Sequence, residues 1–188
     1  MIDLLRKRRS IRRYRPDRIE KKSIALLIEA LLRAPTSRDI QPCEFILIDS
    51  PELLDKLSTA KEHGSEFLAG AALGIVICAD GTKSDVWVED CSIASILVQM
   101  VSQSLGLGSC WIQIRNRDHI SGLTSEEYIQ KALGIPAHIK VEAIVSIGHP
   151  AEKRKPVLKA TLKPEKIWHN GYTEPYIASS PAKKGRGL

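Results

Sequence analysis

The feature that most constrains the fold is an unbroken apolar run, Leu73-Gly74-Ile75-Val76-Ile77-Cys78. A strand with one solvated face alternates apolar and polar residues, whereas a strand covered on both faces is apolar throughout. The run therefore predicts a central strand in a sheet that is covered on both of its faces.

Helical periodicity appears on both sides of this strand in the sequence. Apolar residues recur at three- and four-residue spacing from Ile24 to Leu32, which predicts an amphipathic helix over 20–33. Thr124 and Glu127 have the spacing of a capping box and predict a helix start. Intermixed helices and strands indicate an α+β fold with a mixed central sheet flanked by helices. The other expected helices are 2–9, 51–60, 86–105, 124–133 and a short one near 164–168, and the other expected strands are 45–48, 110–114 and 141–147.

Length and composition favour one domain over 1–188, because 188 residues with 43% apolar residues are enough for a single core. The end of the chain, about 156–188, is rich in Pro, Lys and Gly and is expected to be an extended arm. The charged N-terminus resembles no signal peptide, and no apolar run is long enough to span a membrane. We expect a cytoplasmic protein that does not enter a membrane.

The four cysteines, Cys43, Cys78, Cys91 and Cys110, lie far apart, with no Cys-x-x-Cys pair and no histidines at ligand spacing. This pattern argues against a metal site and suits a reducing compartment. Three of the four stand in apolar surroundings and are expected to be small buried hydrophobic residues.

The basic segment 8–14, Arg-Arg-Ser-Ile-Arg-Arg-Tyr, is the strongest candidate for ligand binding. Guanidinium groups pair bidentately with phosphate oxygens, and the Ser10 hydroxyl can complete the shell. A helix over 2–9, with Ile2, Leu4 and Leu5 facing inward, would place the arginines at its end. The net charge of +6 fits an anionic cofactor, although ordinary solubility would also explain it. No nucleic-acid partner is expected, because the lysines and arginines are spread along the chain and aromatic residues make up only 5% of it.

Four segments occur in the order found in a known family. They are 8–12 (Arg-Arg-Ser-Ile-Arg), 34–45 (Ala-Pro-Thr-Ser-Arg-Asp-Ile-Gln-Pro-Cys-Glu-Phe), 106–112 (Gly-Leu-Gly-Ser-Cys-Trp-Ile) and 147–153 (Ile-Gly-His-Pro-Ala-Glu-Lys). Together they cover nearly the whole chain and resemble the nitroreductase family of FMN-dependent NAD(P)H oxidoreductases. The resemblance implies the nitroreductase-like sheet, FMN as cofactor and a homodimer with NADH or NADPH as cosubstrate.

The resemblance also implies roles for individual residues. Arg8, Ser10 and Arg12 would hold the FMN phosphate and ribityl chain, and Arg9 would lie near the pyrimidine side. A basic residue from 153–159 would meet the phosphate. The full implied set for FMN is Arg8, Arg9, Ser10, Arg12, Thr36, Ser37, Asp39, Gln41, Gln113, Ile114, Lys153 and Arg154. No catalytic side chain is expected, because the flavin is the reactive group.

Two positions depart from the family pattern. Asp39 stands where asparagine is usual, and an ionised carboxylate accepts hydrogen bonds but cannot donate them. Cys43 replaces the usual tryptophan. Thr36 and Ser37 match positions that reach the flavin of the second subunit, while Gln113 and Ile114 match a loop whose backbone amides approach the reactive ring edge.

By resemblance, the reaction is ping-pong. The nicotinamide gives a hydride to bound FMN and leaves, and an electron-poor small molecule such as a nitroaromatic, a quinone or a flavin then enters. Flavin-cleaving and dehalogenating chemistry are alternatives within the same superfamily. A basic binding module without enzymatic activity, which would bind nucleic acid or an acidic partner in a salt-dependent way, is the alternative from another class.

Overall fold

The computed structural model describes residues 1–176. Its sheet contains β1 (Cys43–Ile48), β2 (Leu73–Asp80), β3 (Gly108–Gln113) and β4 (Ile139–Gly148). The strand order is β1-β2-β4-β3, and each neighbouring pair is antiparallel. Every residue of β2 is buried, which confirms the prediction of a central strand covered on both faces.

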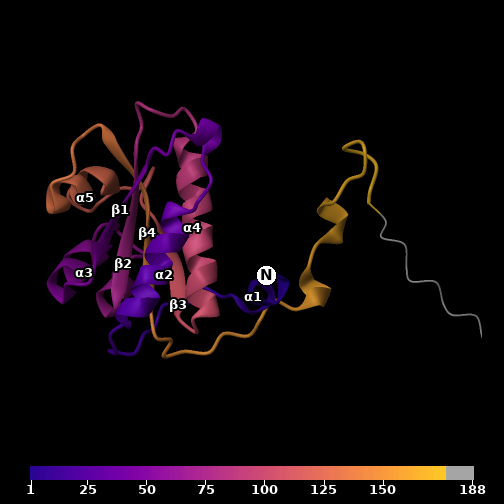
Figure 1. Cartoon of the computed structure of the whole chain (residues 1–188), viewed down its shortest axis with the longest axis horizontal. Helices are drawn as coiled ribbons and strands as arrows, with labels where there is room; N and C mark the ends of the chain where they lie inside the picture. The colour runs from indigo at the N-terminus through magenta and orange to yellow at the C-terminus, as the bar shows by residue number, and fades with distance from the viewer. Residues whose placement is uncertain (177–188) are drawn as a thin grey trace, which may run out of the picture. The chain divides into compact units, whose positions relative to one another are not determined.

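Helices cover both faces of this sheet (Figure 1). One face packs against α2 (Lys21–Leu32) and α4 (Trp87–Ser104), with Leu27, Val98 and Val145 in the core between them. The opposite face packs against α3 (Pro51–Ser58) and α5 (Ser125–Leu133), around Leu57, Ile129 and Ile144. Thr124 caps α5 with the predicted capping box.

The expected α+β fold is confirmed, and the observed helices and strands lie within a few residues of the predicted ones. A mixed sheet was expected, but the four strands of the sheet are all antiparallel to their neighbours. A parallel pairing occurs as the isolated bridge between Ser10 and Ser109. The prediction that Ile2, Leu4 and Leu5 face inward is wrong for this chain. Helix α1 (Ile2–Lys7) buries none of its residues. Ile2 and Leu5 are 57% and 48% exposed, and Leu4 is only partly buried. The physical reason is its length, since six residues make under two turns and cover little core.

The chain divides into a unit over 1–156 and a second one that begins at Val157. By itself, the described part of the second unit contains two short 3₁₀ turns, Lys159–Thr161 and Pro164–Lys166, the latter near the expected helix. Within it, the rings of Trp168 and Tyr172 lie 5.1 Å apart. No helix among residues 1–176 combines the length and the apolar character needed to cross a membrane.

Candidate functional site

The arginine segment lies along the outer edge of β3. Ser10 bridges Ser109, and the Ile11 N–H donates to the Ser109 carbonyl at 3.0 Å. The Ile11 side chain is buried, while the guanidinium of Arg12 remains exposed. This approach depends on Gly108, because a Cβ atom there would lie 2.8 Å from the Ile11 Cβ. The edge of the sheet therefore fixes the backbone of the arginine segment and leaves its guanidinium groups outside the core.

The segment that follows β4 pairs with the arginine segment. The Ala151 N–H donates to the Arg13 carbonyl at 2.8 Å, and Glu152 accepts from the Arg12 N–H at 2.7 Å. The backbone hydrogen bond from Arg12 and the nearby Arg154 guanidinium lower the pKa of the Glu152 carboxyl. Arg154 also forms an ion pair with Glu152, at 2.8 Å between Nε and Oε2. Residues about 140 positions apart are thus held together.

These contacts gather six residues of the predicted FMN site: Arg8, Arg9, Ser10, Arg12, Lys153 and Arg154. Arg9 is held in place, since its guanidinium donates a hydrogen bond to the Lys155 carbonyl at 3.0 Å. Within residues 1–176, no carboxylate lies at ion-pair distance from Arg8, Arg12 or Lys153. Their positive charges are available to an anion, whereas the Arg154 charge is already paired.

The loop 36–41 follows α2 and has strained backbone geometry. Arg38, Asp39 and Gln41 have φ angles of 53°, 53° and 51°. Left-handed backbone in residues other than glycine costs free energy and persists only where neighbouring contacts enforce it. The Gln41 N–H donates to Thr36 Oγ1 at 3.0 Å, and Gln41 Nε2 donates to Asp39 Oδ1 at 2.8 Å. Three of the predicted site residues therefore hold one another in this conformation.

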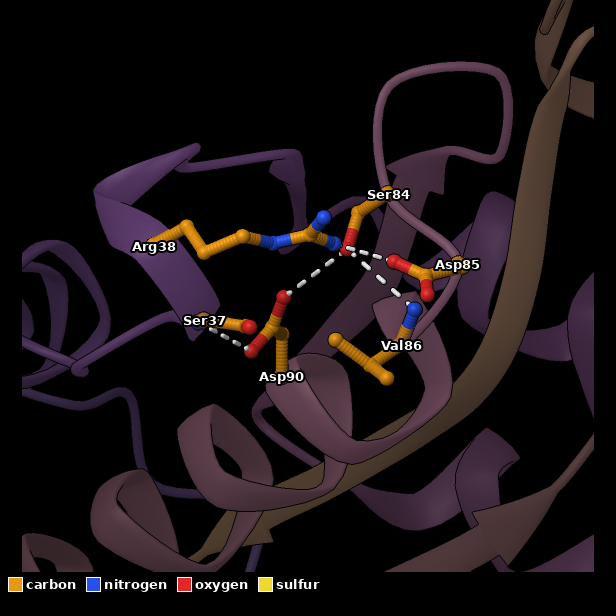
Figure 2. A network of polar contacts seen from close by, with 6 residues as sticks. All are labelled: Ser37, Arg38, Ser84, Asp85, Val86 and Asp90. Carbon is orange, nitrogen blue, oxygen red and sulfur yellow. Dashed lines mark hydrogen bonds and ion pairs between the residues drawn. The ribbon is translucent and has the colours of Figure 1, made fainter.

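A buried carboxylate on α4 anchors the same loop (Figure 2). Asp90 is 2% exposed, and its Oδ1 accepts from the Ser37 N–H at 2.9 Å. Its other oxygen faces the Ser84 hydroxyl at 3.5 Å, and Arg38 forms an ion pair with Asp85. Asp90 was not predicted from the sequence. An acidic residue in the first turn of a helix is common, and only the fold shows that it reaches the loop.

The loop and the arginine segment lie at opposite ends of α4 in one chain (Figure 1). Ser37 is held at the first turn of the helix, whereas Ile11 packs on Gly108, just after the turn that follows Ser104. Eighteen helical residues extend about 27 Å at 1.5 Å per residue. The structure therefore does not bring Thr36, Ser37, Asp39 and Gln41 to the arginine cluster of the same chain.

Gln113 and Ile114 differ in what their backbone amides do. The Ile114 N–H donates to the Glu142 carbonyl at 3.1 Å, so it is engaged in the sheet, and its side chain is fully buried. Backbone groups alternate in direction along an antiparallel strand. The Gln113 N–H thus points away from β4, on the same side as the Ser109 carbonyl that meets Ile11. This geometry differs from the expectation that both amides face a ligand, since only the Gln113 N–H points out of the edge of the sheet. The flavin-binding role of the two residues stays a prediction.

Sequence reasoning also missed Glu142, which lies beside Gln113. The Gln113 amide is 3.5 Å from Glu142 Oε1, and Glu142 Oε2 has no hydrogen-bond partner among the described residues. Glu142 is 3% exposed, and burial raises the pKa of its carboxyl. A polar residue in the predicted strand 141–147 was the available signal, because that strand is otherwise mostly apolar.

The sequence of this chain is similar to those of known proteins over most of its length. The sequence model of the Nitroreductase family matches residues 5–62 and 56–149. A protein of Archaeoglobus fulgidus, with the provisional name NADH dehydrogenase/NAD(P)H nitroreductase, is 33% identical over 81% of this chain and 87% of its own.

Two solved structures extend the agreement to three dimensions. The FMN-dependent nitroreductase of Clostridium difficile R20291 has 42% identity and a TM-score of 0.90, over 92% of this chain and 100% of its own. A protein of Parabacteroides distasonis, with the same provisional name as the Archaeoglobus relative, has 31% identity and a TM-score of 0.83, over 91% and 98% of the two chains. The chain therefore belongs to the nitroreductase family of enzymes.

Proposed function

We propose that this protein is an FMN-dependent oxidoreductase that passes a hydride from NADH or NADPH to an electron-poor small molecule in a ping-pong reaction. The observation that carries the proposal is the arginine cluster, in which Arg8, Arg12 and Lys153 have no carboxylate partner among the described residues. The name of the Clostridium difficile structure as an FMN-dependent nitroreductase supports the choice of cofactor.

The residues present fit a phosphorylated flavin. Charge-assisted hydrogen bonds from Arg8, Arg12 and Lys153 would hold the phosphate, and the Ser10 hydroxyl would add a fourth donor. The outward Gln113 N–H would donate to the ring edge, while its side-chain amide is used by Trp111 and the Arg115 carbonyl. Bound flavin supplies the hydride acceptor and donor, which none of these side chains can provide.

The position of the loop 36–41 supports a site shared by two copies of the chain. Since about 27 Å of α4 separates this loop from the arginine cluster of its own chain, Thr36, Ser37 and Gln41 would contact the flavin of a partner. Asp39 would lie near that ring with its carboxylate bonded to Gln41. Apolar side chains on α2 and α4 stay exposed in the single chain and would be covered in a homodimer: Leu26, Ile28, Leu32, Ile93 and Ile96.

The arm from about 156 onward is proposed to pack on the partner. Its described part exposes large apolar side chains, among them Leu158, Leu162 and Tyr172. In this view, 1–188 is one domain whose arm is completed only by dimerisation. Free cysteines within the described residues support a cytoplasmic location.

The absorption spectrum of the purified protein tests the cofactor, and mass spectrometry of the released compound distinguishes FMN from FAD. Replacing Arg8 and Arg12 together with alanine removes charge-assisted bonds worth roughly 1.5–3 kcal/mol each, which weakens FMN binding by about 10²-fold or more. The matched control, Arg18→Ala with Arg33→Ala, removes the same charge elsewhere on the unit. Equal FMN affinity in both double variants would refute the assigned phosphate site.

Sedimentation tests the shared site separately. We expect the flavin-loaded protein to be a dimer at micromolar concentration, and flavin binding and dimerisation to strengthen each other. A fully loaded monomer would contradict the shared site. A colourless protein that binds nucleic acid in a strongly salt-dependent way would instead support the binding module.

A further inference from the structure

Two cysteines far apart in the sequence have their sulfur atoms in contact. Cys43 is the first residue of β1, and Cys91 lies near the start of α4. Their Sγ atoms are 3.8 Å apart. A disulfide has an S–S distance of about 2.05 Å, so the two sulfurs need to approach by less than about 2 Å. Other pairs of free cysteines in the described chain have no such contact.

The two thiols differ in access and in acidity. In the single chain, Cys43 is half-buried and lines a groove of about 310 Å³ with Leu32 and Phe45, whereas Cys91 is fully buried. In the proposed homodimer the partner covers the Leu32 side of this groove, so a small oxidant is the reagent that fits it. The hydrogen bond from the Cys91 thiol lowers the pKa of the Cys43 thiol, while the same contact and burial raise the pKa of Cys91. A groove-facing cysteine whose sulfur touches a second, buried cysteine sulfur has the geometry in which a peroxide oxidises the first sulfur and the second one then resolves it.

We propose that Cys43 and Cys91 form a reversible intramolecular disulfide when the protein meets hydrogen peroxide. The Cys43 thiolate attacks one peroxide oxygen, which forms an S–O bond, breaks the O–O bond and releases hydroxide. The sulfur is oxidised by two electrons and the peroxide is reduced. The Cys91 sulfur then attacks the Cys43 sulfenic acid, the S–S bond replaces the S–O bond, and the departing hydroxide takes the Cys91 proton to become water.

The location gives this bond a structural consequence. Asp90, the neighbour of Cys91, already accepts from the Ser37 N–H, and Cys43 lies two positions after the loop 36–41. The disulfide therefore ties both ends of that loop to the same turn of α4. This inference does not depend on flavin binding and is testable on the protein as purified.

The test is peptide mapping after oxidation. The full-length protein is reduced with dithiothreitol, freed of reductant, treated with hydrogen peroxide, alkylated and digested with trypsin without reduction. We expect peptide 39–56 to be linked to peptide 84–115, with the loss of two of four titratable thiols per chain and recovery of both on reduction. Since Cys110 shares the second peptide with Cys91, the Cys110→Ser variant serves as the matched control and must form the same link.

The Cys91→Ser variant tests the order of the two steps. We expect its Cys43 to stop as a sulfenic acid that dimedone traps, with no linked peptide. Four free thiols in oxidised wild-type protein, a link that disappears in Cys110→Ser, or conversion of wild-type Cys43 to sulfinic acid without a link would each overturn the proposal. The mapping of wild-type protein decides the matter even where Cys91→Ser fails to fold.

Discussion

Removing the Asp90 carboxylate tests whether this residue anchors the loop 36–41. Asp90→Ala leaves the Ser37 N–H without its acceptor and opens space at a position that is 2% exposed. Hydrogen bonds to a charged group contribute roughly 1.5–3 kcal/mol, and the contact to Ser84 at 3.5 Å is too long to add much. We therefore expect Asp90→Ala to lower the free energy of unfolding by about 2–3 kcal/mol.

Urea unfolding measures this change, and two further variants make the result specific. Asp90→Asn keeps one oxygen acceptor and loses the charge, so it should cost about 1 kcal/mol. Asp85→Ala breaks an ion pair in which the Asp85 side chain is 77% exposed, so its cost should stay below about 1 kcal/mol. If Asp90→Ala costs no more than Asp85→Ala, the buried anchor does not have the role assigned to it.

Three other predictions concern single residues. Burial raises the pKa of the Glu142 carboxyl in the folded protein above its pKa in the unfolded chain, which is about 4.3. The free energy of unfolding therefore falls as the pH rises from the unfolded-state pKa through the folded-state pKa. Glu142→Gln should therefore stabilise the protein more at pH 8 than at pH 4 in urea unfolding, and an equal effect at both would contradict the shift. Gly108→Ala should cost about 1–3 kcal/mol by the same assay through its clash with Ile11, whereas Gly70→Ala, with no atom within 4 Å of its Cβ, should not clash. Asp39→Asn should raise the midpoint potential of bound flavin in a spectroelectrochemical titration, since a negative charge opposes an anionic reduced flavin; an unchanged potential would place Asp39 away from the ring.

Local patterns in the sequence determined the elements of this protein. The apolar run at 73–78 predicted the buried strand β2, and the spacing of Thr124 and Glu127 predicted the cap of α5. These predictions succeed because strand burial and helix capping depend on residues a few positions apart. Four short motifs in the right order likewise predicted the nitroreductase family, which the comparisons confirm.

Contacts between distant segments were decided only by the tertiary structure. The pairing of Arg12 with Glu152, the reach of Asp90 to Ser37 and the contact of Cys43 with Cys91 join residues 48 to 140 positions apart. No local pattern encodes such pairs, because they result from how segments far apart in the chain pack against one another. The pairing of β3 with β4 likewise engages the Ile114 N–H in the sheet and turns the Gln113 N–H outward. Strand register sets this difference, and the sequence motif does not show it.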